Sequence, residues 1–131
     1  MAHPMLLLVW LAVGLALAQG QTYQAFKRKH INYPRTPVTP YCNRMMQRRG
    51  MTTPVCKVLN TFIIANDTNV KKVCNSEGIP VPDTNLWTST QTFTLVNCRL
   101  RGAAHRPPPS HNKIRIACKQ GLPVHFEKII P

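Results

Sequence analysis

The chain has 131 residues, with 17 lysines and arginines against 4 aspartates and glutamates, a formal charge of +13, 12 prolines and 5 cysteines. This length suits one small domain, and an apolar content of 44% excludes a disordered acidic tail. The basic excess extends from Lys27 to Lys128, so it belongs to the domain itself. It favours a polyanionic partner, either nucleic acid or an anionic membrane or glycan surface.

The N-terminus has the pattern of a secretory signal. Met5 to Ala18 is an apolar run too short to span a bilayer, and it is followed by Gln19-Gly20. We therefore predict a signal peptide over residues 1–20 and a secreted mature domain over residues 21–131. Disulfides are expected in that compartment, and Asn66-Asp67-Thr68 is a usable sequon that makes Asn66 a candidate for N-glycosylation.

The mature chain begins with a predicted helix. Tyr23, Phe26 and His30 recur at helical spacing, and Pro34 ends the run. This pattern places His30 on the buried edge of a short helix.

Two more helices are predicted in the first half of the chain. The second begins with Thr39 as its N-cap and Pro40 as its first residue, and Gly50 serves as its C-cap. The third is capped by Asp67 or Thr68, either of which has a side chain suited to that position.

Strands are predicted in the remainder, where β-branched residues are frequent and polarity partly alternates. The predicted strands are Cys56–Ile64, Thr88–Leu100, Lys113–Cys118 and Pro123–Ile129. Helices in the first half and strands in the second favour an α+β fold with an antiparallel sheet.

The alternation of a strand predicts which side chains face the same way. Lys57 and Thr61 share one face of the first strand and Asn60 points to the other, while His125 and Phe126 point to opposite faces of the last. A lysine, a threonine and a histidine could thus line one concave surface. The alternative is that they are ordinary exposed strand residues.

The cysteines limit the redox and metal chemistry. They are Cys42, Cys56, Cys74, Cys98 and Cys118. Their wide spacing without a Cys-x-x-Cys pair argues against a zinc ribbon or a redox motif, and no histidine has metal-ligand spacing, so we predict no metal site. The count leaves two disulfides and one unpaired thiol.

Four blocks of sequence occur in order along the mature chain. They are Phe26-Lys27-Arg28-Lys29-His30, Tyr41-Cys42-Asn43-Arg44-Met45-Met46-Gln47-Arg48-Arg49, Cys56-Lys57-Val58-Leu59-Asn60-Thr61-Phe62 and Pro123-Val124-His125-Phe126. Together they resemble the signatures of the pancreatic ribonuclease A superfamily, and the Cys-Lys-x-x-Asn-Thr-Phe block is the most specific of them. The resemblance implies a ribonuclease A-like, disulfide-linked α+β fold, in which a V-shaped antiparallel sheet and three short helices accompany an active-site cleft.

The resemblance also implies the chemistry. RNA carries its own nucleophile, the 2′-OH, so two imidazoles and one fixed cation suffice without any cofactor. The family roles make His30 the general base, His125 the general acid and Lys57 the cation that stabilises the transition state. Thr61 would read the Watson–Crick edge of a pyrimidine with Phe126 packed beside the base.

The resemblance implies Lys29 and Asn60 as further substrate-binding residues. At several family positions this chain carries an unusual residue. Lys29 replaces the usual glutamine, so it either strengthens phosphate binding or disturbs the pKa of His30. Glu127 replaces an aspartate and could still orient His125. Asn97 replaces an acidic residue that tunes the pyrimidine-reading threonine, which leaves the preference between cytosine and uracil open.

Family pairing implies the disulfides Cys42–Cys98 and Cys74–Cys118, and the absence of an extra cysteine pair between Cys74 and Cys98 is similar to angiogenin-type members. The partner expected for Cys56 falls in Arg106-Pro107-Pro108-Pro109 and is missing. We favour a buried, inert Cys56 thiol over a surface thiol that forms mixed disulfides or a dimer. The missing tether predicts lower stability and a less firmly held Lys57.

Two surface features remain. Arg48-Arg49-Gly50 resembles the basic turn of angiogenin-type members, but we favour the alternative of a solvated helix end, where cations complement the helix dipole. His105 and His111 lie in a predicted Pro-rich loop, match no family site and are expected to be exposed.

Three functions fit this sequence. The first is a secreted, metal-free endoribonuclease that cleaves single-stranded RNA after pyrimidines. The second is a cationic host-defence protein that disrupts membranes without catalysis, and the third is an angiogenin-like signalling ligand. The family adds the cytosolic ribonuclease inhibitor as a partner, and we expect a monomer, with a dimer through Cys56 as the alternative.

Overall fold

The computed structural model describes residues 21–101, 104–106 and 109–131. The predicted signal peptide lies outside these residues, so its prediction stays untested. The helices described are α2 (Tyr23–His30), α3 (Tyr41–Arg48) and α4 (Asp67–Lys71), the last continued by the 3₁₀ turn η1 (Lys72–Cys74). In the described part of the chain, no helix is both long and apolar enough to cross a membrane.

The residues that the structure describes contain seven strands. They are β1 (Leu59–Ile63), β2 (Gly78–Pro80), β3 (Leu86–Ser89), β4 (Phe93–Arg101), β5 (Ala104–Arg106), β6 (Pro109–Lys119) and β7 (Leu122–Ile130). Their order is β1-β4-β6-β3-β2, with β5 on β4 and β7 on β6, and every pairing between them is antiparallel.

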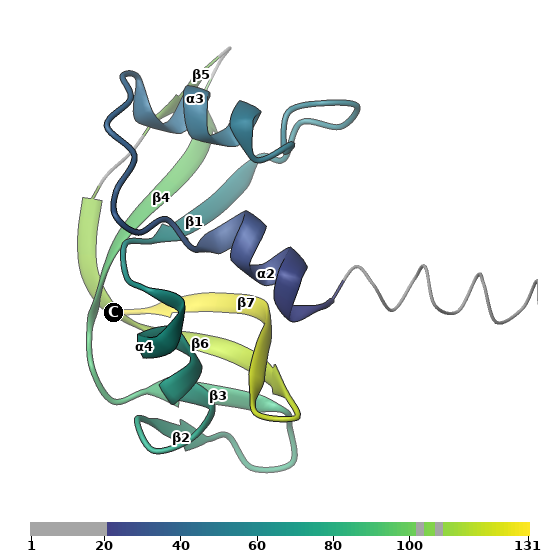
Figure 1. Cartoon of the computed structure of the whole chain (residues 1–131), viewed down its shortest axis with the longest axis vertical. Coiled ribbons are helices and arrows are strands. Elements are labelled where there is room, and N and C mark those ends of the chain that lie inside the picture. The colour runs from purple at the N-terminus through teal and green to yellow at the C-terminus, as the bar shows by residue number, and fades with distance from the viewer. Residues whose placement is uncertain (1–20, 102–103, 107–108) are drawn as a thin grey trace, which may run out of the picture.

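The sheet divides into two arms because β4 and β6 pair over only part of their lengths. Phe93–Val96 pairs with Pro109–Asn112, after which β4 continues beside β1 and β6 continues beside β3 and β7. Figure 1 shows α3 beside the arm of β1, β4 and β5, and α4 beside the arm of β6, β3 and β2. The α+β class and the V-shaped antiparallel sheet are confirmed.

Each arm has its own hydrophobic core. Phe62 and Val96 pack with Met45 and Met46 of α3, whereas their neighbours Ile63 and Leu95 pack in a second cluster with α2, α4 and β6. Successive strand residues face opposite sides of a sheet, so β1 and β4 separate the two cores. α2 belongs to the second core and lies between the two arms (Figure 1).

The disulfides follow this division. Cys42–Cys98 joins α3 to β4, and Cys74–Cys118 joins η1 to β6. These are the pairs that the family resemblance implies. Cys56 is free and exposed, so our preference for a buried, inert thiol is wrong.

Helix termini differ from the sequence prediction in three places. Asn66, and neither Asp67 nor Thr68, is the N-cap of α4, because its Oδ1 accepts a hydrogen bond of 2.8 Å from the Asn69 N–H. Pro40 occupies the N-cap position of α3 without a side-chain hydrogen bond, so Thr39 does not cap that helix. α2 stops at His30, before Pro34 is reached, because the following residue leaves the helix to form a bridge with β1.

The strand boundaries also differ. The predicted strand Thr88–Leu100 is two strands, because the Ser89 side chain closes a turn by donating to the Gln91 carbonyl and accepting from the Ile114 N–H. β1 begins at Leu59, three residues later than predicted. The predicted Pro-rich loop contains β5 and the start of β6, and His111 is exposed there as expected.

Candidate active site

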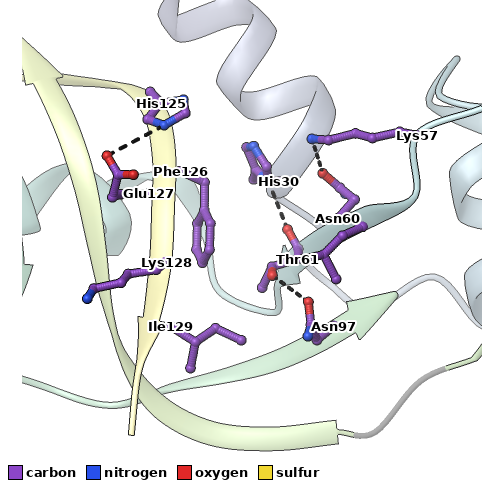
Figure 2. Close-up of a pocket in the computed structure, with 11 residues that line it drawn as sticks. His30, Lys57, Asn60, Thr61, Asn97, His125, Phe126, Glu127, Lys128 and Ile129 are labelled. Atoms are coloured by element: carbon purple, nitrogen blue, oxygen red, sulfur yellow. Dashed lines mark hydrogen bonds and ion pairs between the residues drawn. The ribbon is translucent and has the colours of Figure 1, made fainter. Parts of the chain in front are cut away.

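A cavity of about 370 Å³ opens between α2, β1, β4 and β7. It brings together six of the residues singled out in the sequence, namely His30, Lys57, Asn60, Thr61, His125 and Phe126 (Figure 2). Asn97 and Glu127 also line it. Lys29 does not line the cavity, but its charge acts on both His30 and Lys57.

His30 ends α2 as a buried imidazole, with 6% of its surface exposed. Its Nδ1 lies 2.9 Å from the Thr61 carbonyl oxygen, which can only accept, so Nδ1 carries the proton and Nε2 keeps its lone pair. Burial lowers the pKa of His30 to about 3, and the charges of Lys57, Lys29 and His125 act in the same direction. A neutral imidazole with a free Nε2 is the form that a general base requires.

Two aromatic rings contact His30. Its ring centroid lies 5.1 Å from that of Phe26 and 5.3 Å from that of Phe126, with the Phe126 ring stacked at 30°. These contacts restrict rotation of the imidazole.

Lys57 is positioned by an amide. Its Nζ donates a hydrogen bond of 2.9 Å to Asn60 Oδ1, while Asn60 Nδ2 donates one of 2.7 Å to the Lys29 carbonyl. Burial, followed by the charges of Lys29 and Arg28, lowers the pKa of Lys57. The prediction that Asn60 faces away from Lys57 is wrong, because Lys57 precedes β1 and strand alternation does not extend to it.

Thr61 and Asn97 form the floor of the cavity (Figure 2). They face each other in the β1–β4 register, and the Thr61 hydroxyl donates a hydrogen bond of 2.9 Å to Asn97 Oδ1. A half-turn of the Asn97 amide would present Nδ2 and let the same hydroxyl accept instead.

His125 stands on β7 with 44% of its side chain exposed, and its Nε2 lies 3.8 Å from Glu127 Oε2. The prediction that His125 and Phe126 face opposite ways does not fit the cavity, which both residues line. The β6–β7 register shifts on either side of this pair, and such bulges interrupt strict alternation.

A family model described as pancreatic ribonuclease matches residues 21–127. The chain belongs to the pancreatic ribonuclease family. It is 47% identical to a ribonuclease from Chelonia mydas over 82% of this chain and 98% of that one. It is 40% identical to an angiogenin from Equus caballus over 95% of this chain and 92% of that one.

Solved structures agree with this membership. The crystal structure of green turtle egg white ribonuclease has a TM-score of 0.78 and 44% identity, covering 82% of this chain and 98% of that one. The family resemblance and the pancreatic-type ribonuclease activity are therefore established for this chain. RNA is the polyanion that its family binds.

Sequence reasoning missed some of the cavity wall. Leu59, Lys128 and Ile129 line it as well, and nothing in their residue types signalled this. Within the described residues, no group of three or more histidines, cysteines, aspartates and glutamates could hold a metal ion.

Proposed function

We propose that the protein is a secreted endoribonuclease that cleaves single-stranded RNA on the 3′ side of pyrimidines and needs no metal. One observation carries the proposal: a buried imidazole with a free Nε2 shares a cavity with a lysine and a second, solvent-exposed imidazole. Such a set can remove one proton, stabilise negative charge and deliver another proton without a cofactor.

The proposed reaction uses each group once. His30 Nε2 takes the proton of the ribose 2′-OH, and the 2′-oxygen attacks the adjacent phosphorus. Lys57 stabilises the negative charge that develops on the phosphoryl oxygens. His125 gives its proton to the departing 5′-oxygen, which leaves a 2′,3′-cyclic phosphate and a free 5′-OH.

Base recognition falls to the floor of the cavity. The Thr61 hydroxyl can donate to or accept from a Watson–Crick edge, and the Phe126 ring offers a face beside the base. The cation of Lys29 lies close enough to act on His30 and Lys57, and we assign it to attraction of the substrate phosphate.

Secretion and glycosylation are part of the same proposal. Asn66 uses its Oδ1 to cap α4, which leaves Nδ2 for an N-linked sugar. In material secreted from animal cells, an endoglycosidase should lower the apparent mass of the parent and leave that of Thr68→Ala unchanged. An unshifted parent would contradict glycosylation at Asn66.

The charge of +13 favours a second candidate, a host-defence protein that disrupts anionic membranes without catalysis. Because the chain is similar to angiogenins, we also propose a ribonuclease inhibitor as a partner. We expect a monomer, and the exposed Cys56 thiol offers a disulfide-linked dimer as the alternative. Bacterial killing that survives in His125→Ala would support the second candidate.

The deciding experiment uses a short RNA with one pyrimidine–purine step, in the presence of a chelator. The parent is compared with His125→Ala and with His111→Ala, a matched control for an exposed histidine outside the cavity. The parent and the control should yield the cyclic phosphate, and His125→Ala should not. Absence of cleavage by folded parent protein would overturn the proposal.

A further inference from the structure

The last turn of α2 is held by side chains from outside the helix. The final carbonyls of a helix have no partners within it. Arg49, the C-cap residue of α3, donates from Nη1 to the Arg28 carbonyl at 2.7 Å and to the Lys27 carbonyl at 3.2 Å. Asn60 donates to the Lys29 carbonyl at 2.7 Å. The three carbonyls that precede His30 are therefore all bonded to other segments.

The contact between the two helices is reciprocal. Arg28 donates from its own Nη1 to the Arg49 carbonyl at 2.5 Å. The C-terminal ends of α2 and α3 thus exchange hydrogen bonds, and Arg49 is only partly exposed as a result. Burial lowers the pKa of the Arg49 guanidinium, and the nearby charge of Arg28 acts in the same direction.

The neighbouring Arg48 provides a comparison. Arg48 is the last residue of α3, is exposed, and makes none of these bonds. The basic turn therefore contains one solvated arginine and one that binds backbone. Arg49 is therefore not simply a solvated cation of a basic turn, because its guanidinium binds carbonyls of α2.

We propose that Arg49 is a positioning residue for His30. By binding the carbonyls of Lys27 and Arg28, it fixes the end of α2 from which the His30 imidazole reaches the Thr61 carbonyl. The inference rests on the proposed function, because positioning matters for catalysis only if His30 is the general base. Both bonds come from Nη1, whose two N–H groups are fixed in the guanidinium plane, whereas the lysine ammonium is a freely rotating group on a flexible stem, so lysine is only a partial replacement.

Loss of Arg49 should let the end of α2 loosen. Misplacement of a catalytic group by about 1 Å can cost about 100-fold in rate. A looser helix end would also expose the His30 ring to water and raise its pKa toward 6.5, the ordinary value. The charged groups that face His30, namely Lys29, Lys57 and His125, remain in place in such a variant.

The test compares Arg49→Ala and Arg49→Lys with Arg48→Ala and Arg48→Lys, which remove or keep the same charge one residue away. For Arg49→Ala we expect kcat to fall about tenfold or more, with KM within about threefold of that of Arg48→Ala. Arg49→Lys should recover part of kcat. Titration of the His30 ring protons by NMR should show a raised pKa in Arg49→Ala and the parent value in Arg48→Ala.

Equal kcat values and equal His30 titrations in Arg49→Ala and Arg48→Ala would overturn the inference. Circular dichroism monitors folding, and if Arg49→Ala does not fold, the same criteria applied to Arg49→Lys against Arg48→Lys decide. A folded parent without ribonuclease activity would contradict the proposed function. The His30 titration would still test whether Arg49 positions the ring.

Discussion

The two walls of the cavity hold their imidazoles in different ways. His30 is buried, bonded through Nδ1 to a strand carbonyl and packed against two phenylalanine rings. His125 is exposed on β7 beside a register shift, with a carboxylate 3.8 Å away. Burial keeps the proposed base neutral, and exposure lets the proposed acid exchange protons with water between turnovers. One wall is fixed by packing, and the other is open to solvent.

The largest expected effect is a loss of activity that distinguishes the role of His125 from that of His30. An aryl phosphodiester of uridine has a leaving group that needs no proton, so it bypasses a general acid. His125→Ala should lose about 10²–10⁴-fold on RNA but less than about tenfold on this ester. His30→Gln should lose activity on both substrates. A His125→Ala variant equally impaired on both, measured as kcat/KM, would contradict the assignment.

The buried imidazole of His30 should make the free energy of unfolding depend on pH. The pKa of His30 is lowered from 6.5 to about 3 by folding, so the unfolded chain binds this proton more readily between those values. Stability from this group is therefore complete above the unfolded pKa and is lost as pH falls through that window. The urea midpoint of the parent should drop between about pH 7 and about pH 4.5.

His30→Asn is the matched variant, and its midpoint should change less over the same range. Asp67, whose pKa is lowered by the Tyr23 hydroxyl, loses its contribution at lower pH, and this leaves the His30 effect distinct. A pH dependence unchanged by the substitution would show that His30 is not the group responsible.

A smaller effect concerns the floor of the cavity. The Asn97 amide can accept from or donate to the Thr61 hydroxyl, so we expect similar cleavage after uracil and after cytosine. In Asn97→Asp the carboxylate only accepts, which commits the hydroxyl proton and leaves Thr61 as an acceptor for the uracil N3–H. The uracil-to-cytosine ratio of kcat/KM should rise about five- to tenfold. An unchanged ratio would contradict a role for Asn97 in base recognition.

The smallest expected effect concerns the exposed pair of His125 and Glu127 on β7. Glu127 is exposed and 3.8 Å from His125, so Glu127→Gln should lower kcat by only about threefold. Steady-state kinetics at low and high salt would test this, because an exposed charge pair is screened by ions. A loss of about 100-fold in kcat would mean that Glu127 positions His125 as firmly as packing positions His30.

Much of the site could be predicted because its residues stand in sequence blocks that resemble the family signatures. His30, Lys57, Thr61 and His125 were grouped from the sequence, and the structure places them around one cavity. Alternation failed where it does not apply: Lys57 lies before its strand begins, and a register shift adjoins His125.

Other features depend on long-range packing. Asn66 and Asp67 both have side chains suited to an N-cap, and only the folded backbone selects Asn66. The contact of Arg49 with α2 joins segments 21 residues apart, which no local pattern reveals. The exposure of Cys56 likewise depends on what packs around it.

The thiol of Cys56 has a practical consequence. The other four cysteines are held in disulfides, and Cys56 directly precedes Lys57, which lines the cavity. A thiol-reactive fluorophore should therefore attach at one place on the native, unsubstituted chain, next to a residue of the cavity wall. Binding of RNA could then be followed as a change in emission, with a non-cleavable DNA strand for comparison.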